Sequence, residues 1–218
     1  MKRTLTRLSL VMIATALVFT GCKKDQEDEN NGGGGVTVSG TIAGHDYVDL
    51  GLPSGTKWAT CNVGASTPEE YGNYYAWGET STKTEYTEEN SVTYGQQMSD
   101  ISGNAQYDAA TANWGSTWRI PNRAEVEELI DNCTWTWTTQ NGVNGIKVTG
   151  TNGNSIFLPA AGVSNESIGL ACCYYSSFPG GEENCCVYGI YSDLEDSDRF
   201  ELGWLYRYAG FTVRPVSN

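Results

Sequence analysis

Residues 118–133 have the sequence WRIPNRAEVEELIDNC, which carries the clearest strand-to-helix signal in the chain. Asn122 is a good N-cap, and Glu125 follows three places later, as the partner in a capping box requires. Pro121 fixes the backbone just before the cap. Glu125 also puts negative charge in the first helical turn, where it suits the helix dipole. The apolar residues after the cap fall on one helix face: Val126, Leu129, Ile130 and Cys133.

Short strand-like segments lie on both sides of this helix. Five runs are typical of strands, because they are apolar or alternating and are bounded by turn residues: 47–50, 57–61, 135–138, 146–148 and 156–159. A second, shorter helix is predicted over 108–114 and ends at Gly115. Residues 80–107 are polar and lack periodicity, which predicts a long surface loop. We therefore expect one α+β domain with short antiparallel strands, two helices and long loops.

Large apolar residues elsewhere suggest the core and its closing strand. Three aromatic side chains are expected to be buried: Trp58, Trp118 and Phe157. Phe211 and Val213 alternate inward on a strand near the carboxyl end. Arg214 follows them, and we expect it to pair with a carboxylate.

Several collinear segments resemble the Fibrobacter succinogenes major paralogous domain: 47–52, 58–65, 74–79, 118–122, 131–135, 157–162, 175–177 and 210–216. That family usually has Thr where this chain has Asn122, and Trp where it has Tyr175. It resembles the C-type-lectin-like and formylglycine-generating-enzyme folds, which share the turn before the helix and the terminal strand. The resemblance implies a single C-type-lectin-like domain over residues 36–218.

The amino-terminal residues are typical of an export signal followed by a tether. Residues 1–21 combine a basic start with a short apolar run, and the small residues before Cys22 resemble a bacterial lipoprotein signal. Phe19 stands where Leu is usual. An ordinary secretory signal or a retained anchor is the alternative. Residues 22–35 are charged and then glycine-rich, which predicts a flexible tether.

The tether also bears on where the protein resides. Its acidic stretch after the lipid cysteine resembles the surface-export signal of Bacteroidota lipoproteins, although a plain solvated linker fits the same residues. We expect an outer-membrane lipoprotein that faces the cell exterior. Its membrane contact would be through a lipid on Cys22 alone.

Charge and composition exclude several function classes. The formal net charge is −13, and without residues 1–21 the chain has 10 basic against 26 acidic residues, or −16. Such a surface repels phosphate backbones, so we expect no nucleic-acid partner. His45 is the sole histidine, which disfavours Ser-His-Asp catalysis and poly-His zinc sites. No cofactor is predicted. The acidic run 193–198 is a calcium candidate, but it lacks the glycine of an EF-hand loop and is more typical of a solvated turn.

The carboxyl-terminal third combines doubled cysteines with many aromatic residues. It resembles the variable segment of C-type-lectin-like proteins diversified by retroelements, although an undiversified paralogue explains the same residues. We expect this segment to form an outward-facing ligand-binding surface, because Tyr and Trp supply rigid, amphipathic contact area. The candidate ligand-binding residues are Cys172, Cys173, Tyr174, Cys185, Cys186, Tyr188, Tyr191, Trp204, Tyr206 and Ala209.

The cysteines allow several pairings that the sequence does not decide between. Cys133 is at helical spacing from the apolar face and is expected to be a buried thiol. A Cys61–Cys133 disulfide is possible in an exported protein. Pairing of residues 172–173 with residues 185–186 would staple a hairpin.

These observations together predict a non-enzymatic protein that binds a carbohydrate or protein ligand at the cell surface. No catalytic residue is assigned, because the doubled cysteines do not match the context of a formylglycine-generating site. The first alternative is a fimbrial or envelope structural component whose aromatic face packs against another subunit. The second is an enzyme descended from the formylglycine-generating fold.

Overall fold

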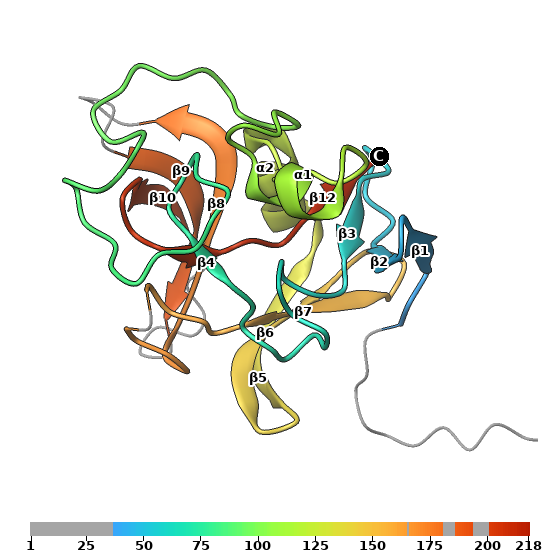
Figure 1. The fold of residues 1–218 in the computed structure, drawn as a ribbon. Coiled ribbons are helices and arrows are strands. Elements are labelled where there is room, and N and C mark those ends of the chain that lie inside the picture. Colours follow the sequence, from blue (N-terminus) through green and yellow to red (C-terminus); the bar gives the residue numbers. More distant parts are fainter. Residues whose placement is uncertain (1–36, 165, 181–185, 194–200) are drawn as a thin grey trace, which may run out of the picture. The chain divides into compact units, whose positions relative to one another are not determined.

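The first and last strands of the described chain belong to one sheet (Figure 1). The computed structural model describes residues 37–164, 166–180, 186–193 and 201–218. The sheet is antiparallel, and its strands in spatial order are β1 (Gly40–Ile42), β2 (His45–Asp49), β3 (Lys57–Ala59) and β12 (Val216–Ser217). Trp58 lies opposite Val48 on one side and Val216 on the other, and all three side chains are buried. The strands predicted at 47–50 and 57–61 are confirmed, with slightly shifted ends.

A second antiparallel sheet confirms the three central strand predictions. Its strands, in order, are β5 (Thr134–Gln140), β6 (Val143–Thr149) and β7 (Ser155–Pro159). On β5, Trp135 and Trp137 lie opposite Val148 and Ile146 and pack against the core, so Thr136 between them points away from it. Every residue of β7 is buried, as expected of a continuously apolar run.

Both predicted helices form where their capping residues place them. Helix α1 (Ala109–Trp114) begins at Asp108, whose side chain accepts a hydrogen bond from the Thr111 amide, and ends at Gly115. Helix α2 (Arg123–Asn132) has both hydrogen bonds of the capping box, between Asn122 and Glu125. The described residues thus combine two helices with small antiparallel sheets, which is the predicted α+β class.

The capping glutamate also anchors the segment before the helix. Arg119 donates two hydrogen bonds of 2.6 Å to the two carboxylate oxygens of Glu125, and Thr56 donates a third. Burial by itself raises the pKa of Glu125, but the bonds from Arg119 and the Asn122 amide outweigh burial and hold that pKa below its ordinary value. The carboxylate is therefore stabilised in its ionised form.

Replacement of Glu125 by glutamine is expected to destabilise the fold by about 2 kcal/mol at pH 7, because it removes a bidentate bond to a charged partner. The pKa of Glu125 is lower in the folded state, so its contribution is present above the unfolded value of about 4.3 and is lost as pH falls through the folded value. Urea unfolding should be measured at pH 7 and below pH 4. The difference in the free energy of unfolding between wild type and Glu125→Gln should be smaller at the lower pH. A difference that does not depend on pH would contradict this assignment.

The third sheet separates two packed cores. Its strands, in order, are β10 (Glu201–Tyr206), β9 (Cys186–Asp193) and β8 (Ala171–Gly180). Side chains alternate along β8, so Cys172 and Tyr174 join one apolar cluster, while Cys173 and Tyr175 join the other. Helix α2 packs on the first side. On the second side lies a two-stranded sheet, β4 (Tyr74–Tyr75) with β11 (Phe211–Thr212). Both faces of β8 are therefore covered.

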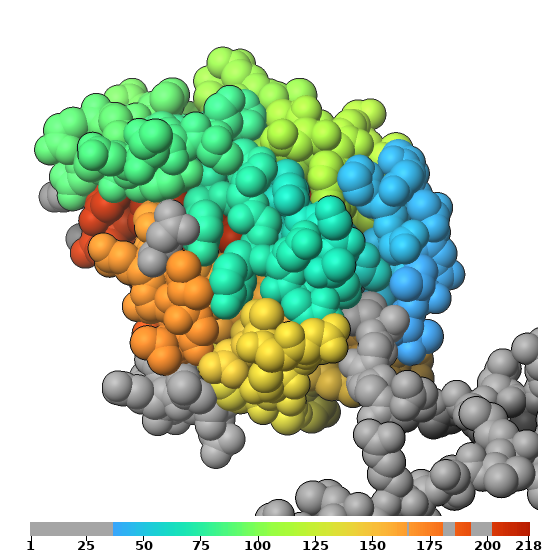
Figure 2. Space-filling view, turned by 60° about the horizontal axis from the view of Figure 1, so that its bottom comes forward, coloured from blue at the N-terminus to red at the C-terminus, as the bar shows by residue number. Residues whose placement is uncertain are grey.

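The predicted loop over residues 80–107 contains no helix or strand. Figure 2 shows this segment lying against the carboxyl-terminal residues. Arg207, which is buried, donates hydrogen bonds to the carbonyls of Thr93 and Gln96, and its guanidinium lies 4.5 Å from the ring centre of Trp77. The Ile101 amide donates to the Ser177 carbonyl. The long loop is thus attached to the third sheet by side chains and backbone.

The predicted burial of the core aromatics is confirmed, whereas the prediction that Arg214 pairs with a carboxylate is wrong. Trp58, Trp118 and Phe157 are all buried. Phe211 and Val213 are also buried. Arg214 is buried too, but its printed hydrogen bonds go to neutral oxygens of three residues rather than to a carboxylate: Asn62, Ala59 and Phe157. No helix among the described residues is long and apolar enough to span a bilayer.

Candidate functional site

Four of the predicted ligand-binding residues belong to the core. Cys172 and Cys173 are fully buried, and Tyr174 and Ala209 are nearly so. Tyr174 donates a hydrogen bond to the Pro159 carbonyl and accepts one from Asn62. The expectation that these four side chains face a ligand is wrong, because three lie on β8, which is covered on both faces, and Ala209 packs in the second apolar cluster.

The burial of β8 also bears on its cysteine chemistry. Burial raises the pKa of the Cys172 thiol well above its ordinary value, and the neighbouring Cys173 adds to the shift. Cys133 is half-buried rather than fully buried, and burial raises its pKa to about 11. Thiols with raised pKa values are poor nucleophiles, because the thiolate is the reactive form.

The disulfide alternatives do not fit the described residues. Cys61 and Cys133 are free thiols, so the Cys61–Cys133 pairing is wrong. The strand register places Cys172 and Cys173 opposite Ser192 and Tyr191, whereas Cys186 lies opposite Gly180, at the other end of the hairpin. Residues six places apart along a strand are separated by about 20 Å, which excludes a staple through Cys186. Cys185 lies outside the described residues.

The remaining aromatic residues do form an exposed surface on the third sheet. Trp204 lies opposite Tyr188 across β9 and β10, and Tyr206 is two residues further along β10, so all three belong to one face. Trp204 is 53% exposed, Tyr206 is 54% exposed and Tyr188 is half-buried. Tyr208 stacks on Tyr206 with ring centres 5.4 Å apart. We call Tyr188, Trp204, Tyr206 and Tyr208 the aromatic platform.

The two remaining described residues of the predicted site, Tyr191 and Cys186, lie on opposite faces of β9. Tyr191 is 39% exposed, but it is an odd number of positions from Tyr188 and therefore occupies the opposite face of β9. Cys186, by contrast, lies opposite Tyr206 and two places from Tyr188, so it shares the platform face, where it is half-buried among the rings. The structure thus separates Tyr191 from the surface to which the sequence assigned it.

Helix α2 holds one edge of the platform in place. The guanidinium of Arg123 lies 4.5 Å from the ring centre of Tyr188 and 5.5 Å from that of Phe178. The Tyr188 hydroxyl donates to Glu127, which also pairs with Arg123. Partial burial and the charge of Glu127 raise the pKa of Tyr188, so its hydroxyl stays protonated. Sequence reasoning missed Arg123, because no local pattern links helix α2 to a strand 65 residues later.

The other rings of the platform have their own supports. Trp204 packs edge-to-face with Tyr188 at 5.4 Å, and its indole lies so close to Gly180 that a Cβ there would overlap the ring. Tyr94, from the long loop, packs edge-to-face with Tyr208. The platform is therefore preorganised, and a ligand need not order these side chains on binding.

Nothing in the described part of the chain brings together three potential metal ligands from His, Cys, Asp or Glu. The side chains of the acidic calcium candidate at 193–198 lie outside the described residues, as do the predicted signal, the lipid site Cys22 and the tether. Comparison of the chain with family models, with curated proteins and with solved structures gives no match in any of the three. The family resemblance therefore stays a prediction.

Proposed function

We propose that this protein is a non-enzymatic surface lipoprotein whose C-type-lectin-like domain binds a carbohydrate through the aromatic platform. The observation that carries the proposal is the pair Trp204 and Tyr206, each more than half exposed on one strand face and each supported by a neighbouring ring. Large exposed aromatics at adjacent same-face positions are unusual on a surface without a partner. The export signal and the lipid on Cys22 complete the proposal.

Carbohydrate suits this surface for physical reasons. The C–H groups on one face of a pyranose pack against the electron-rich face of an aromatic ring, and they need no charged partner. Rings held by packing lose little entropy on binding. Among the described residues the cysteines with raised pKa values offer no activated thiolate, which favours binding over catalysis.

Replacement of Trp204 by alanine is expected to weaken glycan binding roughly 30-fold, equivalent to about 2 kcal/mol, because it removes the largest exposed ring. Tyr206→Ala should weaken binding in the same direction. A glycan array probed with the purified protein identifies the ligand, and calorimetry with that glycan measures the affinity of each variant.

Tyr191→Ala is the matched control, since it removes an exposed tyrosine from the opposite face of the same sheet. It should leave the affinity unchanged, and thermal unfolding should show that all three variants are folded. Equal losses in Tyr191→Ala and Trp204→Ala would refute the platform as the site. Capture of a protein subunit on a protein array, with no glycan bound, would favour the structural-component alternative.

A further inference from the structure

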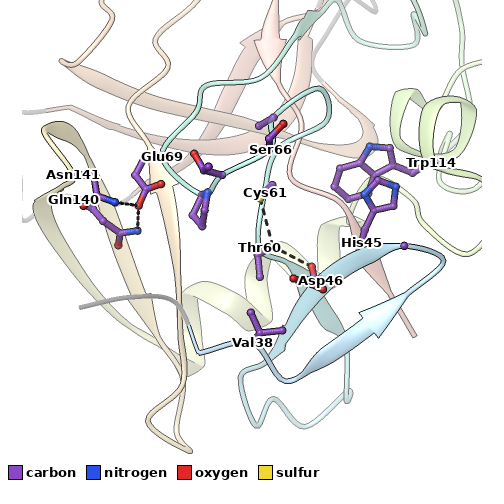
Figure 3. A pocket seen from close by; sticks show the side chains of 14 residues that line it. Val38, His45, Asp46, Thr60, Cys61, Ser66, Glu69, Trp114, Gln140 and Asn141 are labelled. Atoms are coloured by element: carbon purple, nitrogen blue, oxygen red, sulfur yellow. Dashed lines mark hydrogen bonds between the residues drawn. The ribbon is translucent and has the colours of Figure 1, made fainter. Parts of the chain in front are cut away.

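A cleft of about 580 Å³ is lined by the side chains that Figure 3 draws, and none of the described residues that line it belongs to the aromatic platform. Four segments line it: the β1–β2 hairpin, the chain after β3, the end of helix α1 and the turn between β5 and β6. Its volume lies within the range of small-molecule sites, about 300–1,000 Å³. The side chains that matter for its chemistry are His45, Asp46, Glu69, Trp114, Gln140 and Asn141.

One end of the cleft is a rigid aromatic wall. The His45 ring stacks on Trp114 with ring centres 3.7 Å apart and planes 6° apart. The Trp118 ring lies nearly perpendicular to both rings, and its indole donates a hydrogen bond to the Ile42 carbonyl. Burial lowers the pKa of His45, although Asp46 opposes the shift, so the imidazole is neutral at pH 7. The wall therefore offers planar apolar surface without a positive charge.

The other end holds an ionised carboxylate in a fixed orientation. Glu69 accepts hydrogen bonds at one oxygen from the side-chain amides of Gln140, at 2.5 Å, and Asn141, at 2.8 Å (Figure 3). Burial by itself raises the pKa of Glu69, but hydrogen bonds from Gln140, from a backbone amide, from Thr67 and from Asn141 together outweigh it, and the net shift is downward. The amides thus favour the charged form of Glu69 and restrain its rotation.

The charge of the cleft is negative. Asp46 supplies a second carboxylate, whose position is fixed by a 2.7 Å hydrogen bond from Thr41. Of the described residues that line the cleft, none is lysine or arginine. An anionic ligand would meet two carboxylates with no compensating base, whereas a cation would offset their charge.

We propose that this cleft binds an organic cation, whose ammonium or guanidinium group contacts Glu69 or Asp46 while its carbon body packs against the His45–Trp114 wall. Ammonium and guanidinium groups form ion pairs with carboxylates and pack against aromatic rings. The cation could be a free small amine or a Lys or Arg side chain of a peptide. The segments that line this cleft are not those that carry the aromatic platform. The proposal therefore does not depend on the function proposed for the platform.

The test is calorimetric titration of the purified full chain with putrescine, agmatine and capped tripeptides centred on Lys or Arg. 1,4-Butanediol serves as the uncharged counterpart of putrescine. The cations should bind and the diol should not. Peptides that bind at least tenfold tighter than the free amines would identify a side chain as the ligand, and the reverse order would identify a small amine.

Glu69→Gln should weaken binding of the best cation at least tenfold, because the amide cannot form the ion pair. Asp46→Asn is the second variant. Because Asp46 is exposed, its replacement should not unfold the protein, so a loss of cation binding would come from the lost carboxylate. Asp131→Asn is the control, because it changes net charge equally on an exposed part of helix α2. The proposal is overturned if no cation binds at millimolar concentration, if the diol binds equally, or if the cleft variants bind like the control.

Discussion

Replacement of Arg214 by methionine is expected to destabilise the protein by about 3–5 kcal/mol. The guanidinium is buried and donates to the Asn62 side chain and to the carbonyls of Ala59 and Phe157, at 2.9–3.0 Å. Burial lowers the pKa of Arg214, yet an arginine stays charged. Methionine fills similar space but leaves these oxygens without a donor, and each such buried group costs about 1–3 kcal/mol.

This substitution differs from replacement of a buried ion pair by apolar residues, which is often neutral. In an ion pair both partners can be replaced, whereas two of the acceptors of Arg214 are backbone carbonyls and remain. The stability of Arg214→Lys should lie between that of wild type and that of Arg214→Met, because an ammonium keeps the charge but not the planar fork of donors.

Urea unfolding measures the Arg214 effect, and Arg123→Met is its matched control. Arg123 is solvent-exposed, and loss of its ion pair and ring contacts should reduce stability far less than loss of the buried guanidinium. The denaturant slope should stay unchanged in both variants, which shows that stability rather than compactness has altered. Similar losses at Arg214 and Arg123 would contradict the role assigned to the buried guanidinium.

The parts of the fold that the sequence predicts well are those decided by near neighbours. The capping box of helix α2 involves residues three places apart, and the Asp108 cap of helix α1 is equally local. The alternation of Trp135 and Trp137 likewise identifies the core face of β5. Each of these signals is complete within one turn of helix or one strand.

The burial of β8 shows where composition misleads. Its doubled cysteines and tyrosines suggest an exposed face, but an unbroken run of weakly polar residues is equally typical of a strand covered on both sides. Alternation then sends Cys172 to one core and Cys173 to the other. Trp204 and Tyr206 are exposed as predicted, and they lie on the opposite face of β10 from the buried Leu205.

Both candidate sites depend on contacts that no local pattern contains. Arg123 reaches Tyr188 only because helix α2 packs on the third sheet. Glu69 is held by Gln140 and Asn141 from a turn more than 70 residues away. The residue types are visible in the sequence, but their juxtaposition follows from tertiary packing.

Replacement of Gly150 by alanine is expected to cost about 3 kcal/mol or more, because this glycine is where the second sheet meets the first. A Cβ at this position would overlap the carbonyl oxygen of Leu50, which is backbone and cannot rotate away. The neighbouring turn binds the same segment, since Asn152 and Asn154 both donate to the Asp49 carbonyl. To relieve the overlap, the protein would have to separate the two chains and lose these hydrogen bonds.

Gly203→Ala is the matched control, because a Cβ there meets no atom within 4 Å and the residue lies within strand β10. Alanine there should be neutral or stabilise by up to about 1 kcal/mol, since it reduces the entropy of the unfolded chain. Urea unfolding of the two variants therefore separates steric overlap from the general effect of replacing glycine. If Gly150→Ala were as stable as Gly203→Ala, the close approach of residues 50 and 150 would be wrong, and with it the packing of the second sheet on the first.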